Sequence, residues 1–260
     1  MLYWIYDLPS WSVAFLFAAA FVGISWIGAI FVRPVLKLLV GKRPGFNDII
    51  GYVLSFVSVI YGVLLGMLAI VTYQNLAQAD EVSTHEAATL AALYRDLSSY
   101  PDPVRTQLET LLAEHTKYVL TEEWNMQRLG ILGTQSKKLT EFQRLLMSFE
   151  PISTGQQIMH EASVQEFNKL VDHRRMRLHL AETRIPSIMW FTVVIGALIC
   201  MAFIWLFDTS LMAQLIIGGL ASFGMSTMIC LSALMDNPFR GELAVSPAAF
   251  QVVYDSLMKD

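Results

Sequence analysis

Four long stretches without a charged residue follow one another along the chain, and they constrain the fold more than any other feature. They comprise residues 8–32, 49–79, 185–207 and 209–235, with lengths of 25, 31, 23 and 27 residues. An α-helix needs roughly 20 apolar residues to cross the hydrocarbon core of a bilayer. The stretches therefore predict an all-α integral membrane protein with four transmembrane helices.

The composition also indicates that these helices lie in lipid. Charged residues make up 15% of the chain and hydrophobic residues 55%, whereas soluble domains usually carry about 25% charged residues. Buried core helices of a soluble protein are the alternative, but four such stretches would leave too little polar surface to cover them. The net charge of −4 provides no basic field for nucleic acid, so no nucleic acid partner is expected.

The charged residues gather between the second and third stretches. Residues 75–185 hold 12 basic and 15 acidic residues, a net charge of 12 − 15 = −3. Helix two has no Pro or Gly after Gly66, so we expect it to run to about Ser99, where Pro101 and Pro103 end it. The expected parts are helices one and two in 1–74, a helical extramembrane domain in 75–185, helices three and four in 186–235, and an extramembrane tail with a short helix in 236–260. Within 75–185 we expect helices near 103–127, 136–149 and 155–185.

Small residues share one face of helix two. Gly51, Ser55, Ser58, Gly62 and Gly66 follow one another in steps of three or four, and Tyr61 lies beside them. Helix four carries a similar row: Gly219, Ser222, Ser226, Cys230 and Ala233. Such faces permit close packing of helix two on helix four. Alternatively, the face of helix two borders a water path and lines a pore.

Residues that carry catalysis or bind cofactors are not recognised in the chain. Glu81 and His85 are four residues apart, but the second His of a zinc-binding helix is missing, so no metal site is expected. No phosphate-binding loop, nucleophile elbow or carboxylate pair occurs, and the protein is predicted to be neither an enzyme nor dependent on a cofactor. No carboxylate or His lies within the four stretches, which argues against a proton-coupled transporter. The basic segment 173–177 either touches lipid phosphates or acidic partners, or forms a solvated face that pairs with Asp172 and Glu166.

Several motifs are spread over almost the whole chain. They are Asn47-Asp48 with Gly51, Tyr61 through Gly66, Glu86 with Leu90, Tyr94-Arg95, Glu123-Trp124, and Asp236-Asn237-Pro238-Phe239-Arg240-Gly241 with Val245-Ser246-Pro247. Together they resemble the bestrophin-like domain family, a group of bacterial and plant membrane proteins of largely unknown function. The resemblance implies an anion-channel-like architecture.

The tail motif is predicted to be structural. It comprises Asp236, Pro238, Phe239, Arg240 and Gly241. Pro238 stops helix four, because proline cannot continue the backbone hydrogen bonds. Arg240 is then expected to fold back toward Asp236 or toward the carbonyls at the helix end.

The sequence favours an oligomeric, bestrophin-like membrane channel or pore whose ion it does not identify. The alternative is a membrane-anchored sensory or protein-interaction protein that uses the 75–185 domain. Four helices fill their own interior, so a pore needs several subunits. The expected partners are therefore the lipid bilayer, further copies of the chain and ions. The short loop after helix one holds Arg33, Lys37, Lys42 and Arg43. This predicts a bacterial inner membrane protein whose 75–185 domain is extracytoplasmic, although Arg174, Arg175, Arg177 and Arg184 oppose that orientation.

Overall fold

A computed structural model describes residues 3–40, 44–131 and 136–259. Throughout these ranges the regular structure is helical, as predicted for an all-α protein. The chain divides into two compact units. We call Met1–Gln74 with Arg184–Asp236 and Gly241–Leu243 the membrane unit, and Asn75–Thr183 with Asn237–Arg240 and Ala244–Asp260 the helical unit.

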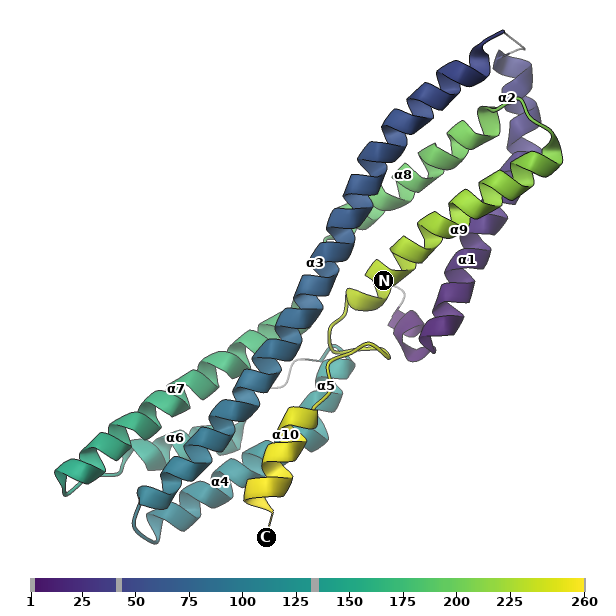
Figure 1. Ribbon diagram of the computed structural model, residues 1–260. Coiled ribbons are helices and arrows are strands. Elements are labelled where there is room, and N and C mark those ends of the chain that lie inside the picture. The colour runs from purple at the N-terminus through teal and green to yellow at the C-terminus, as the bar shows by residue number, and fades with distance from the viewer. Residues whose placement is uncertain (1–2, 41–43, 132–135, 260) are drawn as a thin grey trace. The chain divides into compact units, whose positions relative to one another are not determined.

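Four helical segments are long and apolar enough to cross a membrane, which confirms the four predicted spans. They lie in Ser10–Leu39, Phe46–Ser99, Thr154–Leu206 and Leu211–Met235. The membrane unit contains α1 (Ser10–Ile27), a π-helical turn (Gly28–Val32), α2 (Arg33–Val40), the first part of α3 (Phe46–Asp96), α8 (Ser187–Leu206) and α9 (Leu211–Met235) (Figure 1).

In the membrane unit, α9 packs along α1 (Figure 1). The indole nitrogen of Trp26 donates a hydrogen bond to the Leu215 carbonyl at 3.0 Å. Gly218 and Gly219 let the helices approach closely, because a Cβ at Gly218 would lie 2.9 Å from the Ser25 hydroxyl oxygen. Small residues at such contacts are typical of helices packed in lipid.

The second contact of the membrane unit joins α3 and α8. The Tyr61 hydroxyl donates a hydrogen bond to the Val193 carbonyl at 3.1 Å. Its ring covers Gly196, where a Cβ would lie 2.5 Å from the ring. Around this contact Leu65, Leu68, Ala197 and Cys200 form an apolar cluster. A large ring therefore fits only because the facing position has no side chain.

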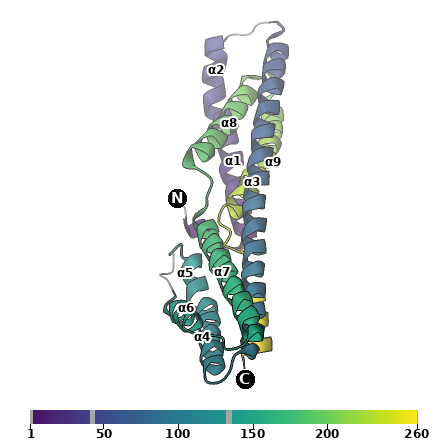
Figure 2. The ribbon, with the colours of Figure 1, turned by 90° about the vertical axis from the view of Figure 1, so that its left-hand side faces the viewer.

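The helical unit is built from α4 (Val104–Tyr118), a π-helical turn (Val119–Glu123), α5 (Trp124–Arg128), α6 (Lys137–Met147), α7 (Thr154–Glu182), α10 (Ala248–Val253) and the end of α3. Figure 2 shows α7 running alongside α3 within this unit. A capping box starts α7, because the Ser153 side chain accepts from the Gln156 amide and the Gln156 side chain reaches back. The core consists of residues from all of these helices, among them Leu90, Leu112, Phe142, Phe167 and Phe250.

The predicted continuation of helix two to about Ser99 is confirmed. α3 is one helix of 51 residues that ends at Asp96, and a short 3-10 turn follows to Ser99. The expected helix near 103–127 is present as α4, the π-helical turn and α5, which end at Arg128. The expected helices 136–149 and 155–185 correspond to α6 and α7. The short tail helix begins at Ala248 and continues as a π-helical turn to Met258.

Candidate functional site

The small-residue face of α3 is open in the described chain. Ser55, Ser58, Gly62 and Gly66 are exposed and Gly51 is half-buried. A Cβ built on Gly51, Gly62 or Gly66 would meet no atom within 4 Å outside its own stretch of helix. No described segment of the same chain therefore packs over these glycines. The face is available to lipid, to another subunit or to water.

Tyr61 differs from its neighbours on α3. It is 6% exposed and directs its hydroxyl to the backbone of α8. The structure thus places Tyr61 in the packing contact between α3 and α8 and separates it from the open face. The sequence predicted that Tyr61 lies beside the small residues, but it did not indicate that the ring points toward α8.

The small residues of α9 are packed, in contrast to those of α3. Ser222, Ser226 and Cys230 are at most 3% exposed, while Gly218 and Gly219 lie against Ser25 and Trp26 of α1. Gly218 and Gly219 thus serve the contact of α9 with α1. The sequence suggested that helix two packs on helix four. At Gly218 and Gly219, however, helix four (α9) packs on helix one (α1).

The tail motif contributes residues to each unit. In the membrane unit, the Asp236 carboxylate accepts hydrogen bonds from the Ile185 amide at 2.8 Å and from the Trp190 indole at 3.2 Å. Burial raises the pKa of Asp236, and these two hydrogen bonds act in the opposite direction. Gly241 has a φ of +104°, a left-handed conformation that side chains rarely adopt. Asp236 therefore satisfies the amide at the chain entry to α8.

In the helical unit, the tail motif supplies part of the core. Phe239 is fully buried, and its ring centroid lies 5.5 Å from that of Trp124 in an edge-to-face arrangement. The Pro238 carbonyl accepts from the Val245 amide at 2.8 Å, and the Asn237 carbonyl accepts from the Arg240 amide at 3.2 Å. Phe239 thus fixes the tail to the core of this unit.

A buried charge cluster occupies the core of the helical unit. The Arg177 guanidinium of α7 binds the Glu86 carboxylate of α3 with two contacts, Nε to Oε2 at 2.6 Å and Nη2 to Oε1 at 3.1 Å. Arg177 Nη2 also donates to Glu123 Oε1 at 3.3 Å, and Arg174 Nη2 lies 3.1 Å from the same oxygen. Arg177 and both carboxylates are fully buried, and Arg174 is 9% exposed.

This arrangement corrects the interpretation of the basic segment 173–177. Arg174 and Arg177 form neither a lipid-binding nor a solvated face, because both are largely buried and pair inside the unit with Glu123 and Glu86. Only Arg175 behaves as expected for a solvated face, with its guanidinium 3.9 Å from Asp172 and most of its side chain exposed. Two of these basic residues are therefore core residues.

Aromatic rings surround the guanidinium of Arg177. Its central carbon lies 5.3 Å from the centroid of Trp124 and 5.5 Å from that of Phe250. A cation at this distance from an aromatic face gains electrostatic attraction, most of all when water is excluded. The rings also separate the charges from solvent, which strengthens both the attraction and the cost of losing a partner.

The protonation states follow from this environment. Burial raises the pKa of Glu86, while the Arg177 charge and hydrogen bond act to lower it. Burial alone would lower the pKa of Arg177, but the charges and hydrogen bonds of Glu86 and Glu123 raise it above its ordinary value. Burial, followed by the charges of Arg174 and Arg177, lowers the pKa of His115 to about 3. His115 is therefore neutral at physiological pH.

Several buried polar atoms around the cluster have no hydrogen-bond partner among the described residues. They are His115 Nε2, Glu123 Oε2, both amide atoms of Gln127, Arg174 Nε and Arg177 Nη1. A buried polar group left unpaired costs roughly 1–3 kcal/mol. The sum over this set would approach the whole stability of a typical domain, about 5–15 kcal/mol. These atoms consequently require further partners.

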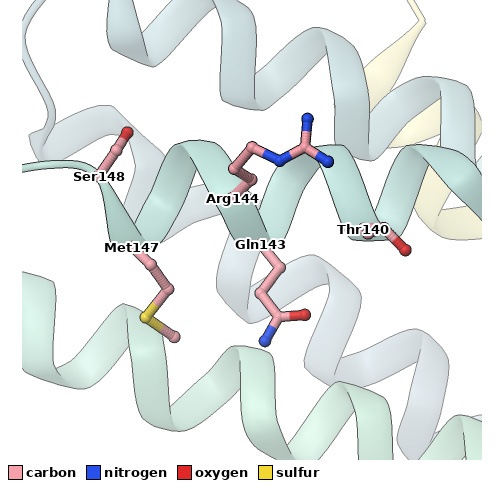
Figure 3. Close-up of a pocket in the computed structure, with 5 residues that line it drawn as sticks. All are labelled: Thr140, Gln143, Arg144, Met147 and Ser148. Atoms are coloured by element: carbon pink, nitrogen blue, oxygen red, sulfur yellow. The ribbon is translucent and has the colours of Figure 1, made fainter.

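The surface of the helical unit carries a shallow depression and a pair of histidines. A depression of about 400 Å³ is lined only by residues of α6 and its end: Thr140, Gln143, Arg144, Met147 and Ser148 (Figure 3). The ring centroids of His85 and His173 lie 5.8 Å apart, with the ring planes tilted by 41°. His85 Nε2 lies 3.7 Å from Glu81 Oε1. Within the described residues no group of three His, Cys, Asp or Glu side chains is arranged to hold a metal ion.

Comparison with known proteins places these features in a family. The sequence model of the bestrophin-like domain matches residues 19–250. A crystal structure of a membrane protein aligns with a TM-score of 0.71 at 13% identity, covering 94% of this chain and 97% of that one. A mutant bacterial bestrophin homologue from Klebsiella pneumoniae aligns with a TM-score of 0.68 at 11% identity, covering 95% and 99%. No curated protein matches the sequence.

Proposed function

Because the chain belongs to the bestrophin-like domain family, we propose that it forms a homo-oligomeric channel or pore in the membrane. A bundle of four helices is filled by its own side chains, so an aqueous path needs several copies around an axis. The observation that carries the proposal is the open small-residue face of α3. The chain's own helices leave Gly51, Gly62 and Gly66 uncovered, as a face that borders a central path requires.

The chemistry of the face suits conduction without ion-coupled transport. It offers the hydroxyls of Ser55 and Ser58 between glycines, and it carries no charge. Uncharged constrictions can select and gate ions by size and hydration. The other exposed residues of α3 are large and apolar, among them Tyr52, Phe56, Val63 and Met67. These large residues would face lipid or the neighbouring subunit, while the small residues would face the path.

A bulky residue on the open face tests the proposal. Gly62→Trp places an indole where the described chain leaves open space, and we expect the current across planar bilayers to fall close to zero with the oligomer intact. Leu220→Trp is the matched control, because Leu220 is a 69% exposed apolar residue of α9; it should conduct like the wild type. Full conduction by Gly62→Trp would exclude α3 as the lining helix. A wild-type monomer in native mass measurements would exclude the pore and favour a sensory or interaction protein.

We further propose the bacterial inner membrane as the location, with residues 75–185 as one extracytoplasmic domain. The support is the positive charge between the first two spans, where Arg33 and Lys37 lie in α2 and Lys42 and Arg43 follow it in the sequence, since short positively charged connections tend to stay in the cytoplasm. Lys138, whose side chain is 44% exposed, provides a labelling site in this domain. A cysteine introduced there should react with an impermeant reagent in intact spheroplasts. Protection until lysis would place the domain in the cytoplasm.

The tail motif is proposed to be structural. Asp236 accepts hydrogen bonds from Ile185 and Trp190, so Asp236→Ala leaves the Ile185 amide without this acceptor. We expect a lower melting temperature and a lower yield of oligomer. An unchanged melting temperature together with a lost current would instead make Asp236 a functional residue.

A further inference from the structure

The unpaired polar atoms of the charge cluster lie on two opposing sets of residues. His115, Glu123 and Gln127 come from α4, the π-helical turn and α5, where their spacing in multiples of four puts them on one face. Arg174 and Arg177 come from α7, and both lie within 3.3 Å of Glu123 Oε1. His115, Glu123, Gln127 and Arg177 are at most 3% exposed, and the Arg174 side chain is 11% exposed. Glu123 thus connects the two sets, and the charges of Arg174 and Arg177 also act on His115.

The set contains both donors and acceptors of hydrogen bonds. Arg177 Nη1 and Arg174 Nε can only donate, Glu123 Oε2 can only accept, and the Gln127 amide offers one group of each kind. The charges are balanced, because two guanidinium groups face two carboxylates. A charged ligand would upset this balance in a buried place. A small neutral molecule that both donates and accepts matches the set.

We propose that ordered water molecules, bound between α4, α5 and α7, complete the hydrogen bonds of this charge cluster. Buried water typically makes two to four hydrogen bonds to polar groups that the protein leaves unsatisfied. Arg177 and Glu123 are fully buried and Gln127 is 3% exposed, so the site is removed from the bulk solvent. The water is therefore an integral part of the folded unit and supports Gln127 and the free sides of Arg177 and Glu123.

The substitution Gln127→Met distinguishes a hydrated site from a dry one. Methionine has nearly the shape of glutamine but lacks the amide, so a hydrated site loses hydrogen bonds and the full-length protein in detergent should melt lower by about 3–6 °C. In a dry site the same change removes an unpaired group, and the melting temperature should rise or stay unchanged. Either of the latter results would overturn the proposal. The control Gln143→Met, at an exposed position of α6, should shift the melting temperature by about 1 °C or less.

A structure of the wild-type protein at high resolution provides a measurement that does not depend on folding of the variant. We expect density for water within hydrogen-bonding distance of the Gln127 amide and Arg177 Nη1. Closure of the site by direct contacts between these side chains would overturn the proposal. Replacement of chloride by gluconate should leave the melting temperature unchanged. A chloride-specific stabilisation that Gln127→Met abolishes would identify an anion as the occupant and would likewise overturn it.

Discussion

The two units of the chain use different polar interactions to hold their helices together. In the membrane unit, ring donors bind backbone carbonyls: Tyr61 binds Val193, Trp26 binds Leu215 and Trp205 binds Ser25. In the helical unit, guanidinium groups bind carboxylates deep in the core. Lipid offers no hydrophobic driving force between helices, so close packing and neutral hydrogen bonds dominate there. The helical unit buries apolar surface from water and can offset the cost of buried charges.

The largest effect is expected from breaking the ion pairs of the helical unit. Arg177→Met leaves the carboxylates of Glu86 and Glu123 without their shared guanidinium, and loss of one partner of a buried pair costs roughly 3–5 kcal/mol. The helical unit should unfold at a markedly lower denaturant concentration. Arg175→Met is the control, because Arg175 is largely exposed, and it should change the free energy of unfolding by less than about 0.5 kcal/mol. Equal stability of the two variants would contradict a stabilising role of the cluster.

A smaller effect is expected from crowding the neutral packing of the membrane unit. In Gly196→Ala, the new Cβ would lie 2.5 Å from the Tyr61 ring, and overpacking of this kind costs roughly 1–3 kcal/mol. Thermal melting of the purified protein measures the loss. Gly224→Ala on α9 is the control, since a Cβ there meets no atom within 4 Å, and alanine should preserve or slightly raise stability. Similar melting temperatures for the two variants would show that the α3–α8 contact is adaptable.

The smallest expected effect is a dependence of stability on pH. It arises from His115 in the helical unit. The pKa of His115 is lowered to about 3 in the folded protein, while the unfolded side chain titrates near its ordinary value of about 6.5. Between these values the unfolded state binds one proton more, so stability falls as the pH falls, by at most about 1.4 kcal/mol per pH unit. The contribution is fully present above pH 6.5.

Comparison with His115→Gln isolates this contribution. Glu86 has a raised pKa and thus the opposite slope, but Glu86 and Glu123, together with the neighbouring guanidinium groups of Arg174 and Arg177, are common to both proteins. Chemical denaturation at pH 7 and pH 5 should therefore show a smaller loss of stability on acidification for His115→Gln than for the wild type. An equal loss in both proteins would mean that His115 is accessible to protons in the folded state.

The sequence predicted the helices well and their contacts poorly, for a physical reason. Charge-free runs and the absence of proline are local properties, and they located the four spans and the length of α3. The bond between Arg177 and Glu86 joins residues 91 positions apart. A basic segment looks the same whether it faces solvent or a buried carboxylate. The family motif at Glu86 and Glu123-Trp124 was the available signal for this core, although it did not identify Arg177.

The open face of α3 shows the same limit. The spacing of the glycines and serines established that they share one side of the helix. It could not decide whether another helix covers that side, since packing and pore-lining faces both favour small residues. The exposure of Gly62 and Gly66, and the contact of Gly218 and Gly219 with α1, distinguish α3 from α9 only in three dimensions.

The π-helical turn at Val119–Glu123 affects the direction in which the side chains of His115, Glu123 and Gln127 point. Residues four apart on an α-helix drift steadily around its axis, because a turn takes only 3.6 residues. A π-turn, with its hydrogen bond spanning five residues, rotates less per residue and cancels part of that drift. His115, Val119, Glu123 and Gln127 consequently stay on one side and are all buried. If the same residues formed a regular α-helix, with no residue deleted, Gln127 would rotate away from the side that His115 and Glu123 share.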